Sequence, residues 1–233
     1  MGRQTKIIKE CINQNKLLKK KKLSVQTFSN VSIRLNDKYF TIKPSGVLPE
    51  KIILKKCPII RISDGKKIAG SYKPSTDTPT HRLIYKKFGE IKSIAHTHSK
   101  YVTAWAQSGK SIPIYGTTHA DYWKSEIPVT NFISQKDLKK NYEANTGNLI
   151  IKTLSKKKLN PFNCPGIIVS GHGGFSWGKN NTDAVKMSEL MEFVAELAYF
   201  TEQIKVKKKL PKYISKKHFE RKFGKKSYYG QKN

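Results

Sequence analysis

Apolar residues recur at helical spacing in several stretches of the chain. Near the N-terminus, a helix over residues 4–18 is predicted by Ile8, Cys11, Ile12 and Leu18, and a run of lysines ends it. The longest stripe predicts a helix over residues 182–204, formed by Met187, Leu190, Met191, Val194, Leu197, Ala198 and Thr201. The other expected helices cover residues 78–88, 101–109, 135–155 (interrupted at 145–147) and 211–223.

Short β-rich runs lie between these helices. Strands are expected over residues 31–35, 39–42 and 93–98, and a hairpin over 57–70 turns at Asp64-Gly65. Residues 166–178 predict a strand that is followed by a glycine-rich turn. Because strands and helices alternate without a strict βαβ rhythm, we expect an α/β protein with a mixed sheet covered by helices. No repeat or long linker interrupts the chain, so a single domain is expected over residues 1–233.

The chain carries a formal net charge of +30 at pH 7, which raises the question of a nucleic-acid partner. Only five of its 46 basic residues are arginines, the residue best suited to base edges and bidentate phosphate contacts. The lysines are scattered along the whole chain and do not gather on one helix or arm. Composition therefore predicts no specific nucleic-acid partner, although a non-catalytic polyanion-binding protein remains an alternative.

Neither a membrane nor a secreted location is expected. No apolar run approaches the roughly 18 residues that cross a bilayer, and the N-terminus lacks an apolar signal core. The cysteines, Cys11, Cys57 and Cys164, are odd in number and widely spaced, which suits free thiols in a reducing compartment. We therefore expect a cytoplasmic protein.

Three histidines carry the strongest chemical signal. His96 and His98 lie two apart on an expected strand, so both imidazoles point from the same face, although such pairs are more often ordinary histidines. His172 lies in the glycine-rich turn that follows another apolar strand. Three imidazoles with an open fourth position are typical of a catalytic zinc site. Asp77 is either a further ligand or proton carrier beside the metal, or the cap of the helix that begins after it.

Short polar loops offer candidate phosphate-binding groups. One of them comes just before an expected helix, where free backbone N–H groups attract an anion. Each loop alone is more often an ordinary turn. Neither a Walker A pattern nor a G-x-G-x-x-G fingerprint is present, so no nucleotide or nicotinamide cofactor is expected. The candidate residues are Ser29, Asn30, Lys43, Ser45, Gly46, Ser75 and Thr76.

These motifs resemble those of the L-ribulose-5-phosphate 4-epimerases, which belong to the class II aldolase family. The resemblance is collinear from about residue 25 to residue 231 and is most specific between residues 73 and 122. The stretches that carry it are SNVS, IKPSG, KPSTDTPTH, AHTHSKYVTAWAQSGKSIPIYGTTHADY, YEANTGN, PGIIVSGHGGFSWGK, KHFERKFG and YYGQ.

The resemblance implies a fold, a set of site residues and an assembly. The fold is a three-layer α/β/α arrangement around a mixed, largely antiparallel sheet. The assembly is a C4 homotetramer with active sites between neighbouring subunits, to which the tail over residues 224–233 contributes. The implied metal ligands are Asp77, His96, His98 and His172, normally on zinc, for which Mn²⁺ or Co²⁺ can substitute. The seven loop residues above match the substrate and phosphate site, and Asp121 and Tyr229 match the proton donor and acceptor.

The implied reaction interconverts L-ribulose 5-phosphate and D-xylulose 5-phosphate. Retro-aldol cleavage between C3 and C4, rotation of the aldehyde and re-addition from its other face would invert C4. The alternative within the family is an L-fuculose-phosphate type aldolase. Such aldolases typically carry Glu in place of Asp77 and lack the pairing of THADY with YYGQ. Arabinose and ascorbate catabolism both use the epimerisation, and the sequence favours neither.

Three departures from the family pattern lie close to the implied site. Phe28 stands where Trp is usual, and Ser29 stands where Gly is usual. Gly174 stands where the turn after His172 usually has Pro. We expect the loss of that proline to loosen the turn and to lower metal affinity or rate.

Overall fold

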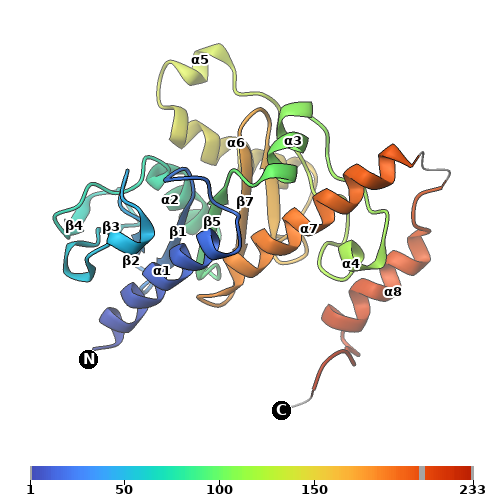
Figure 1. The fold of residues 1–233 in the computed structure, drawn as a ribbon, viewed down its shortest axis with the longest axis horizontal. Coiled ribbons are helices and arrows are strands. Elements are labelled where there is room, and N and C mark those ends of the chain that lie inside the picture. The colour runs from blue at the N-terminus through green and yellow to red at the C-terminus, as the bar shows by residue number, and fades with distance from the viewer. Residues whose placement is uncertain (1, 205–207, 232–233) are drawn as a thin grey trace.

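The computed structural model describes residues 2–204 and 208–231, and in it one antiparallel sheet organises the chain (Figure 1). Its strand order is β4-β3-β2-β1-β5-β7-β6, and every neighbouring pair runs antiparallel. A parallel bridge joins Val129 to Ile168 at the β6 edge. The strands are β1 Asn30–Arg34, β2 Tyr39–Ile42, β3 Ile59–Arg61, β4 Lys67–Ala69, β5 Ser93–Thr97, β6 Gly166–Val169 and β7 Gly173–Gly178.

Helices cover both faces of this sheet and make three layers (Figure 1). Helices α1 and α7 lie on one face, while α2 and α6 pack together on the other. None of the helices in the described part of the chain is both long and apolar enough to cross a membrane. The helices are α1 Arg3–Lys20, α2 Thr78–Lys87, α3 Lys100–Ser108, α4 Thr117–Ala120, α5 Gln135–Leu138, α6 Tyr142–Lys156, α7 Asp183–Gln203 and α8 Lys212–Phe223, with 3₁₀ turns at Pro49–Lys51 and Leu54–Lys56.

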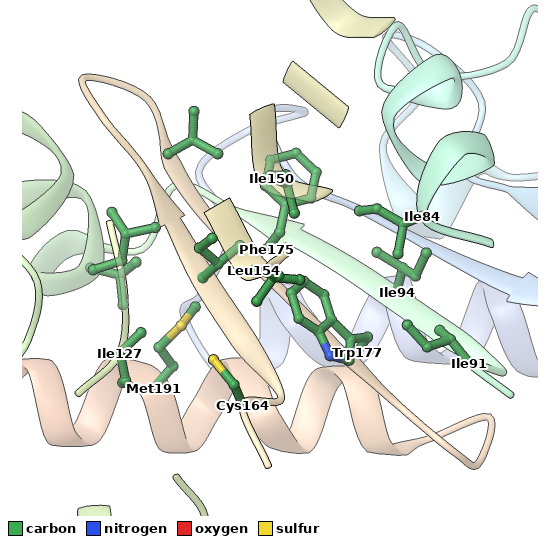
Figure 2. Close-up of a cluster of buried hydrophobic side chains, with 14 of the residues drawn as sticks. Ile84, Ile91, Ile94, Ile127, Ile150, Leu154, Cys164, Phe175, Trp177 and Met191 are labelled. Carbon is green, nitrogen blue, oxygen red and sulfur yellow. The ribbon is translucent and has the colours of Figure 1, made fainter. Parts of the chain in front are cut away.

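Side chains of successive strand residues point to opposite faces of the sheet, so each strand contributes to the helix layers on both faces. Val31 and Ile33 of β1 join a buried cluster with α1 and α7. On the other face, Phe175 and Trp177 of β7 lie beside Ile150 of α6 in the larger core (Figure 2). Both faces of the central strands are therefore buried, and every residue of β1, β5 and β7 is buried although several of them are polar.

Two sequence predictions about secondary structure are wrong. Residues 166–178 form two strands, β6 and β7, around a short turn in which Gly171 adopts a φ of +67°. The middle helix is not interrupted at Gly147, because that glycine is where α6 packs closely on α2. A Cβ there would lie 3.1 Å from the Cα of Thr80 and 3.2 Å from a methyl of Leu83. The break lies earlier, between α5 and α6.

The long helix α7 also differs from its predicted stripe. Met187, Met191, Val194 and Ala198 are buried as expected, but Leu197 is 45% exposed. It lies on an exposed apolar surface that we call the α7 row, formed by Phe193, Leu197, Phe200 and Ile204. Helical spacing identifies α7 as amphipathic, but it does not reveal that a second apolar face is left uncovered within one chain.

Candidate metal centre and substrate pocket

Three histidines converge at one end of the sheet. His96 is in β5, His98 follows β5 directly, and His172 lies in the turn between β6 and β7. Because β5 and β7 are paired neighbours, that turn lies beside the end of β5. One ring nitrogen from each histidine lies within 4.8 Å of the other two. The ring centroids are 4.7 to 4.9 Å apart.

The surroundings of the cluster favour neutral imidazoles. Burial, followed by the neighbouring imidazoles, holds the pKa of His96 well below its usual value. Burial is also the main reason why the pKa values of His98 and His172 are lowered. Neutral imidazole is the form that binds a metal ion, so the three side chains are kept in the ligand state.

Hydrogen bonds also orient two of the three rings. Nδ1 of His96 lies 3.0 Å from the carbonyl oxygen of Gly174, so it carries the proton and leaves Nε2 free. Nδ1 of His172 lies 3.0 Å from the hydroxyl of Tyr142. Nε2 of His96 and Nε2 of His98 are 2.9 Å apart, close to the ~3.3 Å that tetrahedral zinc sites impose on two ligand nitrogens. Three imidazole nitrogens arranged in this way fit a zinc ion or a similar divalent metal.

Asp77 lies beside this cluster without joining it. It occupies the N-cap position of α2, but its side chain makes no capping hydrogen bond, so the simple capping alternative is wrong. Its Oδ2 instead accepts a 2.6 Å hydrogen bond from Nδ2 of Asn30. Its negative charge acts on both His98 and His172 and opposes the lowering of their pKa values. Among the described residues, the group of mutually close ligand atoms contains the three histidines but not Asp77.

The histidines open onto a cavity of about 370 Å³. Two loops, residues 43–46 and 73–76, also line this cavity. Backbone hydrogen bonds hold them side by side: the amide of Ser45 donates to the carbonyl of Lys73, and the amide of Ser75 donates to the carbonyl of Lys43. Burial lowers the pKa of Lys43, whose ammonium lies 3.3 Å from the carbonyl oxygen of Thr27. Predicted residues that line the cavity are Asn30, Lys43, Ser45, Gly46, Ser75, Thr76, Asp77, His96, His98 and His172.

One residue predicted for the phosphate site is not among those that line the cavity, and four lining residues were not predicted. Ser29 is buried and is not among the lining residues; its hydroxyl donates to the carbonyl of Leu23, and its role in the phosphate site stays a prediction. The four are Thr27, Phe28, Tyr142 and Glu143. The polar residues at the start of the YEANTGN motif were the available signal for the last two.

Local packing explains why glycine stands at position 174, where the family usually has proline. This residue is inside β7, not in a loose turn, and α7 packs directly over it. A Cβ at this position would lie 2.5 Å from the terminal methyl of Met191 and 2.7 Å from a methyl of Val102. The space that a larger residue would need is therefore filled by these two side chains.

Asp121 and Tyr229 lie together but not in this cavity. Asp121 accepts two hydrogen bonds from Arg221, at 2.9 and 2.7 Å, and lies 3.0 Å from Nδ1 of His218. Partial burial alone would raise the pKa of Asp121, but Arg221, His218 and the charge of Lys222 lower it below its usual value. The exposed ring of Tyr229 lies against Arg221 and Lys222. Helix α8 thus gathers this second group of residues, which we call the Asp121 cluster.

Comparison with known proteins adds to this geometry. Residues 9–199 match the family model described as Class II Aldolase and Adducin N-terminal domain. The chain is 42% identical over 208 residues to proteins named L-ribulose-5-phosphate 4-epimerase UlaF from Salmonella paratyphi C (strain RKS4594) and Salmonella typhi. Those matches cover 88% of this chain and 90% of each relative.

Solved structures share the fold at lower identity. An L-fuculose 1-phosphate aldolase superposes with a TM-score of 0.78 at 20% identity, covering 93% of this chain and 95% of the aldolase. YgbL from Klebsiella pneumoniae, titled a putative aldolase/epimerase/decarboxylase, superposes with a TM-score of 0.75 at 19% identity, covering 93% and 99% of the two chains. Both similarities concern the fold alone.

Proposed function

The chain belongs to the class II aldolase and adducin family, and we propose that it is an L-ribulose-5-phosphate 4-epimerase. It is then an isomerase that interconverts L-ribulose 5-phosphate and D-xylulose 5-phosphate. The observation that carries the proposal is the 42% identity to epimerases over 88% of the chain. The cavity supports it, because three neutral imidazoles and two polar loops face the same space.

We propose that His96, His98 and His172 hold a zinc ion, with Asp77 beside it as a further ligand or proton carrier. A bound zinc ion supplies a Lewis acid that stabilises negative charge as it develops on substrate oxygens. The neutral state of the imidazoles suits this role, because neutral ligands leave most of the positive charge on the ion. Mn²⁺ or Co²⁺ can take the same ligands.

The two loops are proposed to hold the phosphate. Lys43 contributes a positive charge, and the amide and hydroxyl groups of residues 45–46 and 75–76 face the same cavity. Ser75 and Thr76 also lie just before α2, where the free N–H groups of the helix attract an anion. Inverting C4 through cleavage of the C3–C4 bond requires the aldehyde fragment to turn without leaving. A tightly held phosphate anchors that fragment while its carbonyl rotates.

Proton transfer is proposed to come from Asp121 and Tyr229 of an adjacent subunit. Cleavage of the C3–C4 bond removes a proton from the C4 hydroxyl, and re-addition from the other face returns one to that oxygen. Neither residue lines the cavity of its own chain, so a second copy would have to bring them there. We propose a C4 homotetramer for this purpose, and the exposed α7 row supports an interface between copies.

We also place the enzyme in the cytoplasm. Cys11, Cys57 and Cys164 are buried free thiols, which persist in a reducing compartment. The substrates that we propose are phosphorylated sugars, which a cell retains by their charge. Both points support an intracellular metabolic role.

The test is turnover of L-ribulose 5-phosphate with detection of every product. The proposal expects D-xylulose 5-phosphate without accumulation of glycolaldehyde phosphate or dihydroxyacetone. Net release of those two fragments would mean that the protein is an aldolase, and no turnover in zinc-loaded protein would refute enzymatic activity on this substrate.

Mixed tetramers test the shared site separately. Subunits carrying Asp121→Asn keep the histidines, and subunits carrying His98→Asn keep the Asp121 cluster. After random mixing in equal amounts, about a quarter of the interfaces would join an intact metal half to an intact acid/base half. Recovery of activity is therefore expected from two inactive parents. Verified mixed tetramers that stay inactive would contradict sites shared between subunits.

A further inference from the structure

The three histidines of the cluster are supported unequally. His96 and His172 each have a hydrogen-bond partner at Nδ1, namely the carbonyl of Gly174 and the hydroxyl of Tyr142. For His98, no hydrogen bond to Nδ1 is formed by residues 2–204 or 208–231. Its ring contacts are with the other histidines and, at 6.3 Å between centroids, with Phe28. The direction of the His98 imidazole therefore depends on the backbone that carries it.

That backbone is a junction between a strand and a helix. His98 directly follows β5, and the next residue, Ser99, is the N-cap of α3. On the strand side, Thr97 is held in register opposite Gly174 of β7. On the helix side, the side chain of Ser99 makes no capping bond to its own helix, and the first turn contains no acidic residue. The usual local means of fixing a helix start are absent from α3.

The carboxylate of Glu192, in α7, caps the start of α3 instead. Oε2 of Glu192 accepts hydrogen bonds from the hydroxyl of Ser99 at 2.7 Å and from the amide of Val102 at 3.0 Å. Oε1 accepts a third from the amide of Tyr101 at 2.9 Å. Bonds to an ionised acceptor are about twice as strong as neutral ones, and the negative charge also suits the N-terminus of a helix.

The same contact is reinforced by packing. Tyr101 is in the first turn of α3 and packs against Tyr199 and Phe200 of α7. The centroid of its ring lies 5.9 Å from that of Tyr199 and 6.0 Å from that of Phe200. Helix α7 also packs along β5 and β7, the strands that carry or flank the histidines. Glu192 therefore ties the start of α3 to an element that is already fixed against the sheet.

We propose that Glu192 is a positioning residue for His98. It sets the backbone at the end of β5 and thereby the direction of an imidazole that lacks a hydrogen bond of its own. The inference rests on the proposed function in one respect, namely that the three histidines hold the metal ion. Glu192 is not part of the histidine cluster, and it acts only through residues 99–102.

The test compares zinc affinity in folded protein. Glu192→Ala removes all three acceptor contacts, and Glu192→Gln keeps one acceptor oxygen. The matched control is Glu189→Gln, the same change three residues earlier on α7, where the carboxylate pairs with Lys21 instead. Affinity is measured by competition with a chromophoric chelator at 25 °C, on samples whose circular dichroism and unfolding transition show that they are folded.

Loss of a group that orients a metal ligand typically costs 10–100-fold in affinity. We expect that loss for Glu192→Ala, a smaller loss for Glu192→Gln and no change for Glu189→Gln. A cap with a purely structural role would lower the unfolding temperature and leave the zinc affinity of the folded protein unchanged. That result would overturn the proposal, whereas a wild-type protein that binds no zinc would overturn the proposed metal site itself.

Ser99→Ala provides a milder second test if Glu192→Ala does not fold. It removes one of the three donors to Glu192, and we expect a several-fold loss of zinc affinity. In a Glu192→Leu background, which has no acceptor oxygen, the same change should have much less effect, because the two side chains act through one hydrogen bond. Equal effects in both backgrounds would contradict the link between Glu192 and the metal centre.

Discussion

Lowering the pH from 7 to 5 should strongly destabilise the metal-free protein, because two histidines outside the metal cluster are buried as neutral groups. Burial lowers the pKa of His81 to about 3 and that of His119 to about 4. Neither side chain is exposed enough to take up a proton without disturbing the fold. In the unfolded chain both would titrate near 6.5.

The sign and size of the effect follow from proton linkage. Between pH 6.5 and pH 5 the unfolded chain binds a proton at each histidine and the folded chain does not, so stability falls as the pH falls. Over about 1.5 pH units at ~1.4 kcal/mol per unit, each histidine contributes a loss of about 2 kcal/mol. His81 and His119 together give about 4 kcal/mol, and His96 adds to this because its pKa is also far below 6.5. Asp121, whose pKa is lowered, loses its contribution only at more acidic pH.

Urea unfolding in the presence of a chelator measures this loss. Trp123 and Trp177 are fully buried, so their fluorescence reports unfolding of the core. Protein concentration must be held constant, since assembly shifts apparent stability. His119→Phe should reduce the loss between pH 7 and pH 5 by about 2 kcal/mol. A wild-type free energy of unfolding that changes by less than about 2 kcal/mol over this range would refute the assignment of both buried histidines as neutral.

Three further outcomes are expected. His98→Asn should lower zinc content and turnover together, measured by elemental analysis and epimerase assay, and full activity with bound zinc would remove His98 from the site. Tyr229→Phe should lower turnover by roughly 10²–10⁴-fold, the usual contribution of acid–base catalysis, while zinc content and melting temperature stay unchanged. An unchanged turnover number would exclude Tyr229 from that role. Leu197→Lys in the α7 row should reduce the mass measured by light scattering and abolish turnover while each subunit still binds zinc; an intact, active tetramer would exclude the row as the interface.

The parts of the fold that sequence predicted well are those whose signals are local. The helix that follows His98 was bounded correctly by Gly109, which ends α3 with a φ of +66°. The hairpin at Asp64-Gly65 was likewise identified from its turn residues, and Gly65 has a φ of +83°. Residues 166–178 failed because glycine-rich strand and glycine-rich turn look alike in sequence. What makes Gly173–Gly178 a strand is its pairing with β5 on one side and β6 on the other.

In the candidate site too, local sequence signals were predictable and long-range contacts were not. Two histidines spaced two apart on a strand must share a face, so His96 and His98 could be paired from sequence alone. The burial of Ser29 could not be foreseen, because it depends on a contact with Leu23. Glu192 gave no signal either, since it lies 93 residues beyond the N-cap that it contacts. Long-range contacts of this kind are decided by packing, which leaves no periodic trace in the sequence.

The proposed catalytic site consists of two halves, and their physical settings differ. The metal half is fixed by the sheet, with His96 in β5 and His172 beside it in the β6–β7 turn. The Asp121 cluster lies outside that cavity, but its bidentate ion pair with Arg221 forms within one chain. The Asp121 cluster is therefore already ordered in a single chain. Assembly would only need to bring this cluster next to the metal site of another copy. That arrangement lowers the ordering entropy lost on association, which matters for subunits that each carry a net charge of +30 and repel one another.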